Sequence, residues 1–385
     1  MMTTVLGALT LAIWLYLVFA RGGFWLLRER DDRAPPPEPQ RWPSVVAVVP
    51  ARNEVDVIER SIGSLLAQDY PGAFRVILVD DQSGDGTAAR ARVLPTSAEP
   101  LTVMSGAPLP HGWTGKLWAV SQGVARAAET APDYIWLTDA DIGHSPDNLR
   151  RLVARAEGEG RVLVSLMARL HCASWAERLL IPAFVYFFDM LFPFGRVNDP
   201  RSKVAAAAGG CMLIRREALD AAGGVAAIRG EIIDDCAMGR VMKRQGPIWL
   251  GLTDRAVSLR PYQGWGEIGR MISRSAYAQL GYSPWLLAGT LVGMLITYAA
   301  PLALAVLAVA HPSPGALLGA AAYGLMVLSF VPMLHFYRAP PWLALAVPMI
   351  GAAYSAFTVR SAVDVLRGRG GQWKGRSQAK LGEAA

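Results

Sequence analysis

Two aspartates, Asp139 and Asp141, stand directly after a short apolar run and are separated by one residue. The run, residues 135–137, has the composition of a buried strand, and at the carboxyl end of a strand both side chains can face one hard cation. A divalent ion held there can bridge nucleotide phosphates and neutralise a phosphate leaving group. A polar turn after a strand has the same pattern, so the pair alone leaves both interpretations open.

A second acidic pair, Asp234 and Asp235, opens a helical pattern. The helix dipole by itself favours acidic residues at such a position. The alternative is that Asp235 acts as a general base and takes a proton from an acceptor hydroxyl. A neighbouring carboxylate would raise the pKa of this base toward neutral pH.

Turn-forming polar segments follow two earlier strand candidates, Val49-Pro-Ala-Arg-Asn-Glu54 and Val79-Asp-Asp-Gln-Ser-Gly-Asp-Gly-Thr87. Segments of this kind suit a ligand-binding edge. Asp80 and Asp81 could accept hydrogen bonds from a base or ribose, although a capped helix start after Ser83 or Asp85 explains the same residues. Neither a dinucleotide-binding G-x-G-x-x-G nor a P-loop sequence is present.

Two further positions could meet a sugar nucleotide. Lys116 stands at a helix start, where its amine could reach a diphosphate oxygen; an ordinary exposed lysine is the alternative. Gly209 and Gly210 form a small-residue bend before a strand, which would allow close approach of a sugar ring or merely tight packing.

Strand and helix patterns alternate from residue 44 onward and predict an α/β domain. A mostly parallel sheet with ligands at the carboxyl ends of its strands follows from this order. The expected strands are residues 44–50, 74–80, 101–104, 135–138 and 162–166, and the expected helices are residues 54–68, 117–128 and 146–157.

The composition predicts a membrane protein. Hydrophobic residues make up 52% of the 385 residues and charged residues only 18%, and residues 276–337 and 339–359 contain no charged side chain. Such stretches are typical of membrane spans. The net charge of +7 gathers beside these segments, which favours an anionic membrane surface over nucleic acid as a partner. Three widely spaced cysteines indicate neither a disulfide framework nor a zinc site and fit the cytoplasm.

These observations predict the following organisation. An N-terminal anchor (1–27) precedes a basic, proline-rich linker (28–43), the α/β domain (44–262), an interfacial amphipathic helix (263–283), transmembrane helices (284–360) and a basic cytoplasmic tail (361–385). Residues 175–194 are expected to lie at the membrane interface. Three spans after a cytoplasmic domain would leave the basic tail outside, so one of the apolar blocks 285–310, 315–333 and 341–359 is expected not to cross.

Taken in order, the segments at 49–54, 79–87, 138–141 and 233–235 resemble the family 2 inverting glycosyltransferases, which have a GT-A fold. The resemblance implies that Asp139 and Asp141 hold Mg²⁺ or Mn²⁺ on a nucleoside-diphosphate sugar and that Asp235 is the base. It also implies that Asp81 contacts the nucleotide base and that Lys116 meets the diphosphate. The residues expected to line the nucleotide pocket are Pro50, Arg52 and Glu54.

Membrane-bound members of that family carry Q-x-x-R-W after the catalytic domain. Residues 270–276 are a degenerate version in which Arg274 can stand in for the arginine and Ser275 replaces the tryptophan. This departure counts against processive polymer synthesis. The tail segment Trp373-Lys-Gly-Arg376 is also similar to those members.

A narrower resemblance, to the hopanoid biosynthesis-associated glycosyltransferases, rests on segments 181–184, 198–200, 207–213 and 258–261. It implies a lipid acceptor, with a hopanoid as the first candidate, while family 2 as a whole favours a UDP-linked donor. The arginines at 21, 28, 30 and 33, which follow the N-terminal apolar segment, predict a multi-pass protein of the inner membrane with its catalytic domain in the cytoplasm. A polyprenyl phosphate, glycerolipid or sphingolipid acceptor stays open. Two other classes remain: a nucleotidyltransferase on a similar fold, and a non-catalytic membrane protein that keeps the fold.

Overall fold

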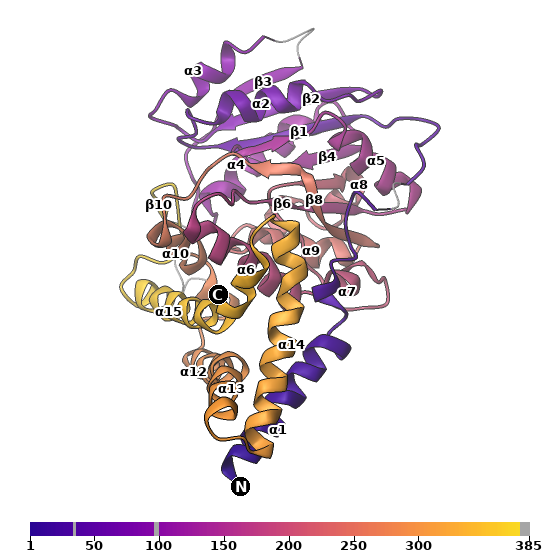
Figure 1. The fold of residues 1–385 in the computed structure, drawn as a ribbon. Helices are drawn as coiled ribbons and strands as arrows, with labels where there is room; N and C mark the ends of the chain where they lie inside the picture. The colour runs from indigo at the N-terminus through magenta and orange to yellow at the C-terminus, as the bar shows by residue number, and fades with distance from the viewer. Residues whose placement is uncertain (34–35, 96–99, 378–385) are drawn as a thin grey trace. The chain divides into compact units, whose positions relative to one another are not determined.

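The computed structural model describes residues 1–33, 36–95 and 100–377, which form two compact units (Figure 1). One, called here the helical unit, comprises Met1–Arg28, Cys172–Gly195 and Tyr262–Gly370. The other, called the sheet unit, comprises Glu29–His171, Arg196–Pro261 and the described part of Gly371–Ala385. The chain therefore enters each unit three times.

The sheet unit is built on a mixed eight-stranded sheet of order β3-β2-β1-β4-β7-β6-β8-β5. Four of the neighbouring pairs are parallel and the three that involve β7 or β5 are antiparallel among the described residues. The strands are β1 (Val45–Ala51), β2 (Phe74–Asp80), β3 (Leu101–Ser105), β4 (Tyr134–Leu137), β5 (Ile142–His144), β6 (Leu163–Arg169), β7 (Met212–Arg215) and β8 (Ile248–Ser258).

Helices pack on this sheet and complete its core. β1 and β4 are buried along their whole length, and Trp136 is fully enclosed, as expected of a strand covered on both faces. The helices are α2 (Ile58–Leu66), α3 (Thr87–Arg92), α4 (Gly115–Ala128), α5 (Asn148–Gly158), α8 (Arg216–Ala221) and α9 (Asp234–Lys243), with a 3₁₀ helix at Val225–Ile228 and, where the chain passes between the units, α7 (Phe194–Asn198). The predicted α/β class with a GT-A sheet is confirmed.

The register of the parallel strands decides where the polar segments meet. Ala51 pairs with Asp80 at the end of β2, and Val48 pairs with Leu137 at the end of β4. The carboxyl ends of β1, β2 and β4 therefore share one edge of the sheet. Since all three segments that follow these strands are polar, this edge gathers them, as the sequence predicts.

The helical unit contains the apolar helices. α1 packs against α13 and α14, and its Gly7 lies so close to Gly315 that a Cβ there would be 2.2 Å from the Gly315 carbonyl oxygen. The helices are α1 (Met2–Leu15), α6 (Trp175–Leu191), α10 (Trp265–Ser273), α11 (Ala276–Gln279), α12 (Pro284–Met294), α13 (Ala300–Ala310), α14 (Pro314–Phe336) and α15 (Val347–Leu366), with π-helical turns at Tyr16–Ala20 and Leu295–Ala299 and 3₁₀ helices at Phe24–Leu26 and Pro341–Ala346.

Four helices among the described residues are long and apolar enough to cross a membrane: Met2–Ala20, Pro284–Ala310, Pro314–Phe336 and Pro341–Leu366. They fit the predicted N-terminal anchor and C-terminal transmembrane helices. The segment expected at the membrane interface, residues 175–194, forms α6, which packs within the helical unit against α14, α15 and α10.

Candidate active site

The two aspartates that follow β4 lie on a turn whose backbone is fixed by hydrogen bonds. Thr138, between β4 and Asp139, is buried, and its hydroxyl donates a hydrogen bond to the carbonyl of Gly210 at 2.8 Å. The Ile142 amide donates to the Asp139 carbonyl at 3.2 Å, and the Leu259 amide donates to the Asp141 carbonyl at 2.8 Å. These backbone contacts fix the turn, so that both carboxylates remain partly exposed at the edge of the sheet.

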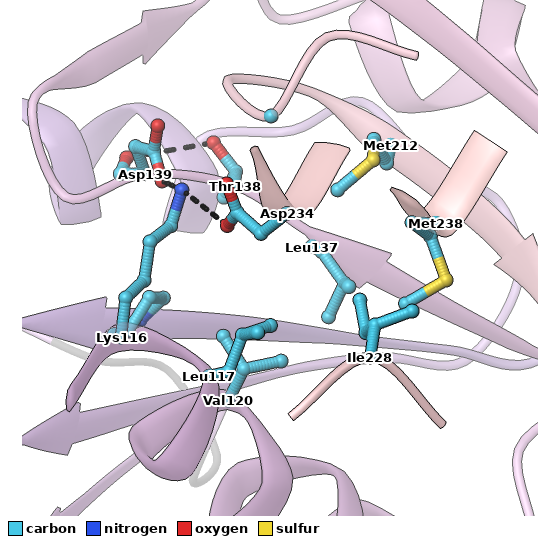
Figure 2. Close-up of a pocket in the computed structure, with 12 residues that line it drawn as sticks. Lys116, Leu117, Val120, Leu137, Thr138, Asp139, Met212, Ile228, Asp234 and Met238 are labelled. Atoms are coloured by element: carbon cyan, nitrogen blue, oxygen red, sulfur yellow. Dashed lines mark hydrogen bonds and ion pairs between the residues drawn. The ribbon is translucent and has the colours of Figure 1, made fainter. Parts of the chain in front are cut away.

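Lys116, in the first turn of α4, joins the two acidic pairs (Figure 2). Its Nζ lies 2.7 Å from Asp139 Oδ1 and 3.1 Å from Asp234 Oδ2. Burial is the main cause of a raised pKa of Asp139; the Lys116 ammonium opposes it, while Asp141 and Asp234 add to it. The carboxylates therefore outnumber the cation at this point, and the cluster favours a further positive charge.

Asp235, at the start of α9, lies beside this pocket, next to the pocket-lining residues Asp234 and Gly209. The Gly209 amide donates a hydrogen bond to Asp235 Oδ2 at 3.2 Å, and the Cys236 amide donates to Oδ1 at 2.7 Å. Burial, followed by the charge of Asp234, raises the pKa of Asp235 to about 6. A half-buried carboxylate that titrates near neutral pH and is oriented by two amides has the properties of a general base.

Gly209 keeps this pocket open. A Cβ at Gly209 would lie 3.3 Å from Lys116 Nζ and 3.6 Å from the Asp235 Cβ, so a larger residue would crowd both. The opposite wall is apolar, and Figure 2 shows Leu137, Ile228, Met212 and Met238 around the charged groups. The pocket thus has charged groups at one end and an apolar wall along one side.

A second charged group lies beside the first. Arg260, which follows β8, forms an ion pair with Glu54 and places its Nε 3.7 Å from Asp141 Oδ2. Glu54 is buried, and its Oε1 also lies 2.8 Å from Lys374 Nζ. Burial raises the pKa of Glu54, and the Lys374 ammonium counteracts this by favouring the carboxylate form.

The ends of β1 and β2 are linked by Arg52. Its Nη1 donates hydrogen bonds to the backbone carbonyls of Asp81 and Gln82, and it lies 3.8 Å from Asp81 Oδ2. Asp81 is fully buried, whereas Pro50 lines the pocket that holds Lys116 and Asp139. The helix-start interpretation of this segment also has support, because Asp85 Oδ1 accepts a hydrogen bond from the Thr87 amide at 3.0 Å.

The carboxylates at this edge fit Mg²⁺ or Mn²⁺ when a bound phosphate completes the coordination of the ion. No group of three or more His, Cys, Asp or Glu side chains that could hold a metal ion occurs in the part of the chain that the structure describes. Asp139 and Asp141 offer two hard carboxylates within a cluster of excess negative charge. Magnesium characteristically binds one or two carboxylates and completes its coordination with water and phosphate oxygens.

The structure thus brings most of the candidate residues to one edge and adds others. Arg260 was not among the candidates, Asp234 was expected only to raise the pKa of its neighbour, and Gly209 rather than Gly210 borders the charged cluster. The Gly210 carbonyl instead supports Thr138. Arg274 belongs to the helical unit, so its part in donor binding stays a prediction.

Known proteins resemble this chain over part of its length. The family model described as "Glycosyl transferase family 2" matches residues 46–223. The succinoglycan biosynthesis protein ExoO of Rhizobium meliloti is 33% identical over 163 residues, which are 39% of this chain and 44% of that protein. The beta-monoglucosyldiacylglycerol synthase of Synechocystis is 33% identical over 135 residues, 33% of this chain and 27% of that protein. The chain thus spans less than half the length of these curated relatives.

A solved structure has a similar fold. The mannosyltransferase PcManGT from Pyrobaculum calidifontis, in complex with GDP-Man and Mn²⁺, superposes with a TM-score of 0.52 at 21% sequence identity. The match covers 93% of this chain and 99% of the other. At this identity the likeness supports the fold alone. The sheet unit therefore has the GT-A fold, and residues 46–223 match the glycosyl transferase family 2 model, which agrees with the predicted glycosyltransferase domain.

Proposed function

We propose that the protein is a membrane-bound inverting glycosyltransferase that moves a sugar from a nucleoside-diphosphate sugar to a lipid acceptor. The observation that carries this proposal is the convergence of Asp139, Lys116 and Asp234 on one pocket, with Asp235 bonded to Gly209 at its border. A nucleotidyltransferase on a similar fold would not need a base on that side of the pocket. A non-catalytic protein would have no reason to keep a carboxylate with a raised pKa there.

The proposed reaction is a single displacement. Asp235 takes the proton of an acceptor hydroxyl, and the resulting oxygen attacks C1 of the sugar from the face opposite the leaving group. The bond from that oxygen to C1 forms as the bond from C1 to the phosphate oxygen breaks, and the nucleoside diphosphate departs with the negative charge. Since attack comes from the opposite face, the anomeric configuration inverts.

The chain's own residues hold the donor. Lys116 would release Asp139 and Asp234 in part and share its charge with the diphosphate, as a preorganised cation does in phosphate chemistry. A divalent cation held by Asp139 and Asp141, when bound, would supply the charge that neutralises the leaving diphosphate. Pro50, Arg52, Glu54 and Asp81 would form the nucleotide end, and Arg274 would add a further positive charge.

The lipid acceptor is supported by the helical unit and by the sequence resemblance. Four helices suited to a membrane adjoin the transferase domain in the chain, and one relative carries a glycolipid synthase name. The resemblance to hopanoid-associated enzymes makes a hopanoid with a free hydroxyl the first acceptor to test and UDP the first nucleotide. Polyprenyl phosphates and glycerolipids or sphingolipids are the next.

We assign the catalytic domain and the C-terminal tail to the cytoplasmic side of the inner membrane. Residues 371–377 belong to the sheet unit, so the chain crosses an even number of times between Pro261 and Gly371. α1, α13 and α14 pack together, whereas α15 contacts α10 and α11 as well as α12, and it carries Arg360 and Asp364. We therefore assign crossings to α1, α12–α13 and α14, and the interface to α15. Labelling of a His311→Cys variant from the cytoplasmic side only would contradict this assignment.

The direct test is transfer by the purified full chain. Labelled UDP- and GDP-sugars are incubated with Mn²⁺ and with membrane lipid extracts, one of them containing hopanoids, and the product is identified by mass and anomeric configuration. The proposal expects one glycolipid with inverted configuration. A nucleotide-sugar product formed from a sugar phosphate, or no product from any donor, would contradict it.

A further inference from the structure

The segment that follows α15 returns to the sheet unit as a short hairpin. β9 (Gln372–Trp373) and β10 (Arg376–Ser377) are antiparallel and are joined by Lys374 and Gly375. Both turn residues have left-handed backbone angles, with φ of +47° and +80°. A two-residue turn of this kind matches the twist of the strands it joins and places its first side chain at the tip.

The tip of this hairpin contacts the segment after β1. Lys374 Nζ lies 2.8 Å from Glu54 Oε1 and donates a hydrogen bond to the Asn53 carbonyl at 3.2 Å. In return Arg52 Nε donates to the Lys374 carbonyl at 3.2 Å. Three consecutive residues of the segment, Arg52 to Glu54, therefore hold one lysine that is more than 300 positions away in the chain.

Arg52 extends this contact to the end of β2. Its Nη1 donates to the backbone carbonyls of Asp81 and Gln82 while its Nε holds the hairpin. Asn53 and Gln82 are non-glycine residues with φ of +53° and +54°. Conformations of this kind carry strain and persist where the surrounding contacts enforce them, and these contacts include the hairpin tip.

The buried carboxylate of Glu54 makes the contact with Lys374 important for stability. The residue is only 7% exposed, and its carboxylate has two cationic partners, Arg260 from the end of β8 and Lys374 from the hairpin. Removing one partner of a buried charge costs more than breaking an exposed pair, because the remaining charge is left less compensated. Loss of Lys374 would therefore loosen the segment that ends β1.

We propose that Lys374 is a positioning residue for donor binding: the hairpin tip fixes the nucleotide end of the site by holding Arg52, Asn53 and Glu54. The ligand is a nucleoside diphosphate or its sugar ester. This inference rests on the proposed function and deepens it, because it assigns a role in donor affinity to a tail that follows the last apolar helix.

The test uses the purified full chain in detergent and has two readouts. Calorimetric titration with UDP and with GDP, in the presence of Mn²⁺, gives the dissociation constant, and steady-state transfer gives the donor KM and kcat separately. Lys374→Met keeps the side-chain length and removes the charge, and Lys374→Arg restores a cation. Arg369→Met is the matched control, since Arg369 is an exposed basic residue of the same tail outside the hairpin.

The proposal expects Lys374→Met to weaken diphosphate binding and raise the donor KM about tenfold while kcat changes less than threefold. Lys374→Arg should recover most of the affinity, and Arg369→Met should match the wild type. A second variant, Gly375→Val, strains the left-handed turn while it keeps Lys374, and it should reproduce the rise in donor KM.

Unchanged binding in Lys374→Met would overturn the proposal, as would an equal loss in the Arg369→Met control. Tighter binding in Lys374→Met would also overturn it, because the tip would then compete with the donor instead of shaping its site. These outcomes presuppose a wild type that binds one of the two diphosphates. A wild type that binds neither would count against the proposed function itself, and the inference would fall with it.

Discussion

In the sheet unit almost every large apolar side chain is covered, whereas in the helical unit many are exposed. Among the described residues, Val93 is the only large apolar side chain of the sheet unit that is exposed. The helical unit exposes a long series that includes Trp285, Val309, Leu328 and Met349. The sheet unit thus has the surface expected of a domain in water, and the helical unit has an apolar surface of the kind that lipid covers.

The charged residues are also distributed unequally between the two units. Residues 276–337 of the helical unit contain no charged side chain, whereas the sheet unit collects Lys116, Asp139, Asp234 and Asp235 at one edge. The comparison teaches that the chain separates its chemistry from its anchor. If this is right, substitutions of the same kind should have effects of very different size in the two units.

The largest effect is expected for Asp235→Asn. An amide of the same shape cannot take the acceptor proton, so kcat should fall about 10³-fold, within the range for loss of a general base. The control is Asp220→Asn, which changes an exposed carboxylate on α8 that forms an i, i+4 ion pair with Arg216. Steady-state transfer assays check both; full activity of Asp235→Asn would refute the assignment of the base.

A charge introduced at an exposed apolar position should have a different effect in each of the two units. Leu328→Arg, in the middle of α14, should cost about 3 kcal/mol of membrane insertion. Val93→Arg, on an equally exposed side chain of the sheet unit, should change stability by no more than about 0.5 kcal/mol. The membrane-integrated fraction after alkaline extraction and the melting temperature measure the two effects, and similar results for both variants would break the comparison.

The smallest effect concerns the pH profile. Since the pKa of Asp235 is raised to about 6 and the base must be unprotonated, kcat should fall toward acid pH below about 6. Asp234 contributes to that raised pKa through its charge, so Asp234→Asn should move the acid limb to lower pH. A limb that stays in place or moves to higher pH would argue against the coupling of the two carboxylates.

Much of the fold could be predicted because the signals are local. Residues 74–80 form a strand with the predicted bounds, since an apolar run ends there in two aspartates. The helix predicted from residue 54 begins only at Ile58, because the Glu54 carbonyl first accepts hydrogen bonds from the amides of Val57 and Ile58 in a turn. The three-residue β5 is too short to give a pattern, and nothing local marks β7 as antiparallel.

The site divides in the same way. Asp139, Asp141 and Asp235 could be proposed from their places at element ends, and the strand register then brings the first two to the predicted edge. The cations that pair with the carboxylates could not be assigned. Arg260 and Lys374 meet Glu54 from positions more than 200 residues away, and no local pattern specifies such a contact. Gly209 and Gly210 share one bend, and the sequence alone does not indicate that Gly209 is the glycine beside Lys116 and Asp235.

The measurement that tests the account most directly is donor binding to two carboxylate variants. UDP and GDP are titrated into the purified wild type, Asp139→Asn and Asp235→Asn, each with and without Mn²⁺, by calorimetry. The account predicts that Asp235→Asn, inactive in transfer, binds within about threefold of the wild type, whereas Asp139→Asn loses its metal-dependent binding. Metal-dependent binding that survives in Asp139→Asn and disappears in Asp235→Asn would contradict the division of the site into a donor side and a base.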